Sequence, residues 1–185
     1  MKRLITIPTF FTFSRLIIGS FIVPYLIVHY LSSHDFILNF FIMFVFLLFS
    51  FTDFLDGFYA RKLNQQTSWG ATLDHCADKI FISSIFIALV FKGACHYSWA
   101  ISLIARDFFV MGLREIALEY GAVIKVSVWG KLKTTFQILL IILLLGLYSL
   151  SYFLHQIVVV LFIATFIISW GSAIAYLCGL YKKLK

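Results

Sequence analysis

The chain has 185 residues, of which 62% are hydrophobic and 12% are charged, and its formal net charge is +7. A soluble domain is typically about 45–50% apolar and about 25% charged, so this composition excludes an ordinary soluble globular protein and indicates an integral membrane protein. The apolar segments are also too numerous and too long for a secretory signal peptide.

Six apolar segments follow one another along the chain, each close to the roughly 20 residues that a transmembrane helix needs. They cover residues 10–31, 36–60, 70–91, 99–118, 132–149 and 153–180. The connections between them are short and leave no room for a separate soluble domain. We therefore expect an all-α integral membrane fold of six transmembrane helices, with residues 1–185 forming a single domain.

The basic residues are distributed unevenly between the two sides of such a six-span topology. One side holds Lys2, Arg3, Arg61, Lys62, Arg114, Lys125, Lys131, Lys133, Lys182, Lys183 and Lys185, whereas the loops on the other side hold only Lys92. By the positive-inside rule, the basic side faces the cytoplasm and both termini lie inside. The basic runs lack the interleaved aromatic residues typical of nucleic-acid-binding proteins, so no nucleic acid partner is expected.

Four aspartates lie at the expected cytoplasmic ends of the second and third segments. Asp53 and Asp56 are three residues apart, and Asp74 and Asp78 are four apart, so each pair shares one helix face. An ionised carboxylate at the edge of the hydrocarbon is costly, and such residues are functional by default. Small residues stand one helical turn from three of the acids and leave the backbone open to a ligand: Gly57, Ala60 and Gly70.

Clustered carboxylates repel one another unless a cation compensates them, and all-oxygen ligands favour Mg²⁺ or Mn²⁺. Four carboxylates from two helices can hold two such ions in an arrangement suited to phosphoryl chemistry. Two alternatives stay open. Aspartates at helix ends can be caps or solvated charges. Transporters also keep intramembrane acids as proton or cation relays, although those sites usually lie near the membrane midplane.

The spacing D-x2-D-G-x2-A-R-x8-G-x3-D-x3-D resembles, without a gap, the signature of the CDP-alcohol phosphotransferase family. Its eight fixed positions are Asp53, Asp56, Gly57, Ala60, Arg61, Gly70, Asp74 and Asp78. The stretches IPTFFTFSR, ARDFFVMGLRE and VSVWGKLKTT are similar to blocks of the bacterial phosphatidylglycerophosphate synthase branch and extend the resemblance over residues 7–135. One departure is His75, which stands where that branch usually has proline.

The resemblance implies transfer of a phosphatidyl group from CDP-diacylglycerol to sn-glycerol 3-phosphate, giving phosphatidylglycerophosphate and CMP in phospholipid biosynthesis. It implies that the four aspartates bind two divalent ions and that Asp78 is also the general base. The residues implied to surround the cytidine diphosphate are Gly57, Ala60, Arg61, Gly70 and, from the first segment, Thr12. A sister enzyme with inositol phosphate, phosphatidylglycerol or serine as acceptor stays open. The resemblance also implies a homodimer among the lipids of a bacterial cytoplasmic membrane. The orientation inferred from the basic residues makes the active site face the cytoplasm.

The phosphate of the acceptor requires cations, and four basic residues are candidates to bind it: Arg106, Arg114, Lys131 and Lys133. The two arginines lie eight residues apart on approximately one helix face, and the two lysines flank the start of the fifth segment. A buried arginine in a membrane needs an anionic partner, and phosphate suits its bidentate geometry. The open alternatives are an ion pair of Arg106 with Asp107 or Glu115, and headgroup contacts for the lysines.

Overall fold

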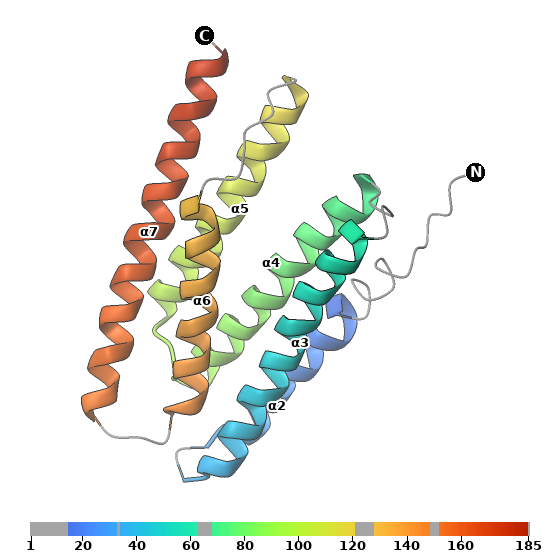
Figure 1. Cartoon of the computed structure of the whole chain (residues 1–185). Coiled ribbons are helices and arrows are strands. Elements are labelled where there is room, and N and C mark those ends of the chain that lie inside the picture. The colour runs from blue at the N-terminus through green and yellow to red at the C-terminus, as the bar shows by residue number, and fades with distance from the viewer. Residues whose placement is uncertain (1–14, 33, 63–67, 121–127, 149–151, 185) are drawn as a thin grey trace. The chain divides into compact units, whose positions relative to one another are not determined.

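The computed structural model describes residues 15–32, 34–62, 68–120, 128–148 and 152–184. Side-chain positions are described for these residues except 15, 52–62, 68–72, 74, 128, 129, 131, 152–155, 183 and 184. All regular structure in these ranges is helical (Figure 1). The elements are η1 (Arg15–Gly19, a π-helical turn), α2 (Ser20–Tyr30), α3 (Phe36–Lys62), α4 (Ser68–Phe91), α5 (Tyr97–Glu119), α6 (Val128–Gly146) and α7 (Tyr152–Leu184).

Each of the six predicted apolar segments overlaps an α-helix, which confirms the all-α fold class for the described residues. The first segment is covered by η1 and α2 from Arg15 on, while its residues 10–14 lie outside the described residues. The helices extend beyond the apolar residues in several places: α6 begins four residues before the expected start, at Val128, and α7 continues to Leu184. Hydrophobicity marks what a membrane can bury, whereas a helix continues as long as its backbone hydrogen bonds form. Polar residues at the helix ends are therefore included in the observed elements.

Apolar surface is abundant on these helices. By length and composition together, one segment of the described residues, Gln156–Lys182 in α7, qualifies as a membrane span. Shorter apolar helical segments cover Leu16–Tyr30, Phe36–Phe51 and Leu132–Gly146. Large apolar side chains also lie exposed, with Ile37 at 84% and Phe21 at 73%. Because apolar side chains are unfavourable in water, a surface of this kind is expected where lipid or another protein covers it.

The chain forms two compact units, residues 1–95 and residues 96–185. In the first unit, α2 packs against α3 and α4, and aromatic rings connect α3 to α4: Phe46 stacks on Phe81 with ring centroids 6.0 Å apart. Gly19, the last residue of η1, lies so close to this pair of helices that a side chain there would approach both Phe49 and Phe81 to 3.2 Å. The absence of a side chain therefore permits this close helix packing.

The first unit ends where a glycine terminates α4. Gly93 has a φ of +72°, a left-handed conformation that glycine adopts without steric cost. Its N–H donates to the carbonyl of Val90, and the N–H of Ala94 donates to that of Leu89. These two bonds form a Schellman motif, which satisfies the last carbonyls of the helix. The chain then enters α5, where the ring of His96 caps the helix by accepting from the N–H of Ser98.

In the second unit, α7 packs against both α5 and α6. Its core consists of fully buried aliphatic side chains: Leu103, Leu140, Ile141 and Leu145. Trp99 of α5 stacks on Phe162 of α7, with ring centroids 4.2 Å apart and ring planes 8° from parallel. Further along the same pair of helices, the indole N–H of Trp170 donates to the hydroxyl of Ser102 at 3.0 Å. The α5–α7 contact therefore combines aromatic packing with polar links.

A buried side chain closes the connection between α2 and α3. Asn39, in the first turn of α3, is fully buried. Its Oδ1 accepts from the N–H of Ser32 at 3.1 Å, and its Nδ2 donates to the carbonyl of Ser32 at 2.7 Å. One side chain therefore pairs both backbone polar groups of Ser32, which lies in a stretch without helical hydrogen bonds.

Replacing Asn39 by Ala is expected to destabilise the protein by about 1–3 kcal/mol, because both groups of Ser32 lose their partner in a partly buried place. The free energy of unfolding can be measured by denaturant titration of the purified protein in detergent. Asp35→Asn is the matched control, since Asp35 is exposed in the same connection and its replacement should change stability by less than about 0.5 kcal/mol. Equal stabilities of the two variants would contradict the assignment.

Candidate active site

The signature positions lie at adjoining ends of two consecutive helices. Asp53 and Asp56 are in the C-terminal part of α3, and Asp74 and Asp78 are in the N-terminal part of α4. Residues 63–67 join these two ends, which lie at the same end of the first unit (Figure 1). Both stretches are helical, as expected, so the two positions of each pair lie about one turn apart along their helix.

The side chains of most signature residues lie outside the described positions. This applies to Asp53, Asp56, Gly57, Ala60, Arg61, Gly70 and Asp74, while Thr12 lies outside the described residues altogether. Asp78 is described and is half-buried on α4. Among the described side chains, no group of three or more His, Cys, Asp or Glu residues could hold a metal ion. Because that set omits three of the four acids, the metal site stays a prediction.

His75 does not interrupt its helix. α4 runs unbroken from Ser68 to Phe91, and His75 is half-buried within it. A proline at this position would lie in the second turn of the helix, where it lacks the N–H for a helical hydrogen bond. With histidine instead, the backbone carrying Asp74 and Asp78 keeps regular helical geometry.

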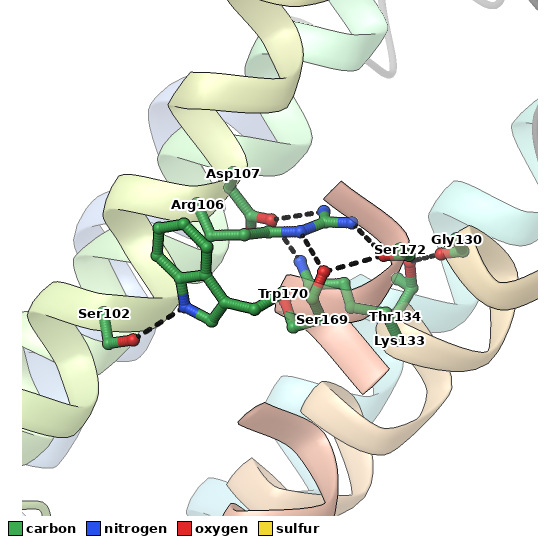
Figure 2. A network of polar contacts seen from close by, with 9 residues as sticks. All are labelled: Ser102, Arg106, Asp107, Gly130, Lys133, Thr134, Ser169, Trp170 and Ser172. Atoms are coloured by element: carbon green, nitrogen blue, oxygen red, sulfur yellow. Dashed lines mark hydrogen bonds and ion pairs between the residues drawn. The ribbon is translucent and has the colours of Figure 1, made fainter. Parts of the chain in front are cut away.

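A second group of polar residues lies inside the other unit, where α5, α6 and α7 meet (Figure 2). We call it the arginine cluster, and it consists of Arg106, Asp107, Lys133, Ser169 and Ser172. Arg106 is 6% exposed, Asp107 4% and Lys133 1%. Charged side chains are almost never buried this deeply unless they are paired.

The charged groups of the arginine cluster share one carboxylate oxygen. Oδ1 of Asp107 accepts from Nη1 of Arg106 at 3.2 Å and also from Nζ of Lys133. The first contact joins neighbours on α5, and the second joins α5 to α6. Asp107 therefore fixes the heads of two cations around a single atom.

Two serines of α7 complete the arginine cluster. Nε of Arg106 donates to the backbone carbonyl of Ser169 at 2.9 Å, and Nη2 donates to the hydroxyl of Ser172. That hydroxyl in turn donates to the same carbonyl of Ser169 at 2.8 Å. The planar guanidinium thus forms hydrogen bonds along two of its edges and links α5 to α7.

The four predicted acceptor residues have different surroundings. Arg106 and Lys133 belong to the arginine cluster, Arg114 is half-buried two turns further along α5, and the side chain of Lys131 lies outside the described positions. The ion pair of Arg106 with Asp107, which the sequence left open, is present. Because Lys133 pairs with the same carboxylate, the arginine cluster keeps a net positive charge. Phosphate binding by Arg106 and Lys133 stays a prediction.

Three residues of the arginine cluster were missed as site candidates: Asp107 as a partner of Lys133, and both serines. A signal for the serines does exist in the sequence. Thr165, Ser169 and Ser172 follow one another at spacings of four and three within an otherwise apolar helix, and all three are buried. A polar stripe of this kind on an apolar helix indicates a polar partner inside the bundle.

Comparisons with known proteins agree with the signature. The model of the CDP-alcohol phosphatidyltransferase family matches residues 5–174. Three bacterial relatives carry the name CDP-diacylglycerol–glycerol-3-phosphate 3-phosphatidyltransferase. That of Mycoplasma pneumoniae is 39% identical over 100 residues, which are 54% of this chain and 44% of the relative. That of Bacillus subtilis is 42% identical over 94 residues, or 51% and 49% of the two chains.

The relative from Haemophilus influenzae is 39% identical over 132 residues, which are 68% of this chain and 69% of the relative. The chain therefore spans about half the length of the first two relatives and more than two thirds of the third. The family match covers nearly the whole chain and includes every signature position. The chain belongs to the CDP-alcohol phosphatidyltransferase family, whose members are embedded in membranes.

Proposed function

We propose that the chain transfers a phosphatidyl group from CDP-diacylglycerol to sn-glycerol 3-phosphate, giving phosphatidylglycerophosphate and CMP. The observation that carries this proposal is the complete eight-residue signature on the adjoining ends of α3 and α4. The names of the bacterial relatives, which state the same donor and acceptor, support the choice of substrates within the family.

The chemistry of the four acids fits divalent metal ions. Asp53, Asp56, Asp74 and Asp78 provide oxygen ligands only, which Mg²⁺ and Mn²⁺ prefer, and the acids repel one another unless a cation compensates them. We assign two such ions to these residues. When bound, the ions supply positive charge that neutralises the diphosphate of the donor.

The remaining signature residues suit the donor and the proton transfer. The acceptor hydroxyl attacks the β-phosphorus of CDP-diacylglycerol, CMP leaves, and Asp78 takes the hydroxyl proton as general base. The residues assigned to the cytidine diphosphate are Gly57, Ala60, Arg61, Gly70 and Thr12. Small residues allow the nucleotide to approach the helix backbone, and the cation of Arg61 favours its phosphates.

The phosphate of the acceptor is assigned to Arg106, Arg114, Lys131 and Lys133. Support comes from the arginine cluster, in which two cations accompany one carboxylate. A buried group of net positive charge is stabilised by an anion, and a phosphate ester provides one. Serine carries no phosphate and makes no use of such a group.

We extend the proposal to the topology. The six α-helices form six transmembrane spans of one domain over residues 1–185, with both termini and the active site at the cytoplasmic face of a bacterial inner membrane. The uneven distribution of basic residues supports the orientation. The family resemblance supports a homodimer.

CMP release by the purified protein in mixed micelles with CDP-diacylglycerol and Mg²⁺ tests the proposal. sn-Glycerol 3-phosphate, inositol phosphate, serine and phosphatidylglycerol are offered separately, and EDTA replaces Mg²⁺ in the blank. We expect metal-dependent release with glycerol 3-phosphate. Release only with another acceptor would identify a sister enzyme. No release with any acceptor, combined with cation flux across sealed vesicles, would identify a transporter.

A further inference from the structure

The arginine cluster holds two cations in positions that they would not keep by themselves. Like charges repel, and both side chains are long and flexible, so their heads separate unless something holds them. In the structure, the Oδ1 atom of Asp107 accepts a hydrogen bond from Arg106 and another from Lys133 (Figure 2). The two heads therefore lie within hydrogen-bonding distance of a single oxygen, although they come from α5 and α6.

Arg106 keeps donors for a further ligand. A guanidinium has five N–H donors. Within the described part of the chain, three of them donate to Asp107, to the carbonyl of Ser169 and to the hydroxyl of Ser172. The contacts to α7 hold the guanidinium plane in place, so the remaining donors have defined directions.

Two more buried polar atoms lie on the helices of the arginine cluster, one of them in a residue of the cluster itself. Ser169 Oγ and Gln137 Nε2 are buried and have no hydrogen-bond partner among the described residues. Gln137 follows Lys133 by four residues on α6, so both side chains lie on the same face of that helix. Buried polar atoms nearly always have partners in native proteins, so both atoms leave a hydrogen bond to be made on the helices that carry the arginine cluster.

We propose that Asp107 is a positioning residue, whose buried carboxylate holds Arg106 and Lys133 side by side as a preformed pair of donors for the phosphate of the acceptor. This proposal rests on the proposed function. Asp107 does not contact the acceptor, because its anionic oxygen repels a phosphate. It acts through the two cations, and it thereby reduces the ordering that the phosphate would otherwise have to impose.

Asp107→Asn distinguishes a positioning role from a simple charge effect, because the two predict opposite changes in the KM for sn-glycerol 3-phosphate. The substitution removes a negative charge, which by charge alone would strengthen phosphate binding. If Asp107 positions the cations, the link that holds Lys133 beside Arg106 is lost, and the KM for sn-glycerol 3-phosphate rises about tenfold or more, as for the loss of one charge-assisted hydrogen bond. The KM for CDP-diacylglycerol should stay within about twofold, since the donor binds the signature residues.

A conservative variant and a matched control complete the series. Asp107→Glu keeps the carboxylate and should give an acceptor KM between those of wild type and the Asn variant. Ser102→Ala removes the neutral bond to Trp170 across the same α5–α7 contact, so it should lower stability without changing either KM. Because KM does not depend on how much protein is folded, a destabilised variant can be assayed directly in membranes.

An unchanged acceptor KM in Asp107→Asn would show that Asp107 has a purely structural role. A lower acceptor KM would show that the charge of Asp107 matters more than its positioning of the cations. Either result overturns the proposal, and so does a rise in the donor KM alone. If the Asn variant yields no folded protein, the Glu variant decides, and an acceptor KM equal to or below that of wild type overturns the proposal.

A binding measurement separates this proposal from the proposed function. In phosphate-free maltoside micelles, sn-glycerol 3-phosphate should raise the unfolding temperature of the wild type more than an equal concentration of glycerol does. The difference should disappear in Asp107→Asn. If the wild type shows this shift but no turnover with glycerol 3-phosphate, the proposed function fails and the positioning role stands. If turnover occurs but the acceptor KM does not rise in Asp107→Asn, the proposed function stands and the positioning role of Asp107 fails.

Discussion

Asp78→Asn is expected to lower the rate of CMP release by a factor of about 10² or more, while the protein stays folded. The substitution keeps the size of the side chain but removes the only charge that could accept the proton of the acceptor hydroxyl from this position. General bases contribute about 10²–10⁴ to a rate. Loss of a carboxylate from the metal site would add to the effect. The rate is measured in mixed micelles at saturating donor and acceptor.

The matched control for Asp78→Asn is Asp35→Asn, which neutralises an exposed aspartate elsewhere in the first unit and should leave the rate unchanged. The unfolding temperatures of both variants show whether the fold is retained. Asp78 is half-buried on a regular helix, so an isosteric amide is not expected to disturb α4. A folded Asp78→Asn protein that keeps more than about a tenth of the wild-type rate would exclude Asp78 as the base.

Arg106→Met is expected to lower the free energy of unfolding by about 3–5 kcal/mol. Breaking a buried ion pair by removing one partner is costly. In this case the substitution also removes the hydrogen bonds to the carbonyl of Ser169 and to the hydroxyl of Ser172, which link α5 to α7. Methionine fills much of the same volume, so the effect reports the polar links rather than a cavity. Denaturant titration in detergent measures it.

Two further variants calibrate this result. Arg106→Lys keeps the charge but has no planar fork, so it should lose part of the stability, because an ammonium cannot hold both serine contacts in the same geometry. Ser102→Ala loses only the neutral bond to Trp170 across the same pair of helices and should cost about 1 kcal/mol. An Arg106→Met protein as stable as Ser102→Ala would contradict the role of the arginine cluster in joining the helices.

Much of the fold could be predicted because the ends of several apolar segments coincide with residues that begin or end a helix. The second apolar segment begins at Phe36, as α3 does, and the third ends at Phe91, where Gly93 terminates α4. The ends of α6 and α7 could not be placed from apolar length, because helices such as α7 continue into polar residues like Lys182. The distinction between helix and membrane span needs the surroundings of each residue, which a hydropathy pattern does not contain.

The candidate site also has a part that could be predicted from the sequence and a part that could not. The signature could be placed on two helix ends because its spacings are local and the helices are regular. The partners of Arg106 could not be predicted, because Ser169 and Ser172 lie 63 and 66 residues away along the chain. Which face of α7 meets α5 depends on packing. Sequence adjacency suggested Asp107 only as a partner for Arg106, whereas its contact with Lys133 depends on how α5 and α6 each pack against α7.

The measurement to make first follows both products of the reaction at once. The purified protein is incubated with CDP-diacylglycerol, Mg²⁺ and labelled sn-glycerol 3-phosphate, and CMP in the aqueous phase is compared with label in the lipid phase. Phosphatidyl transfer to glycerol 3-phosphate predicts one labelled lipid for each CMP released. CMP without labelled lipid, or neither product, would contradict it.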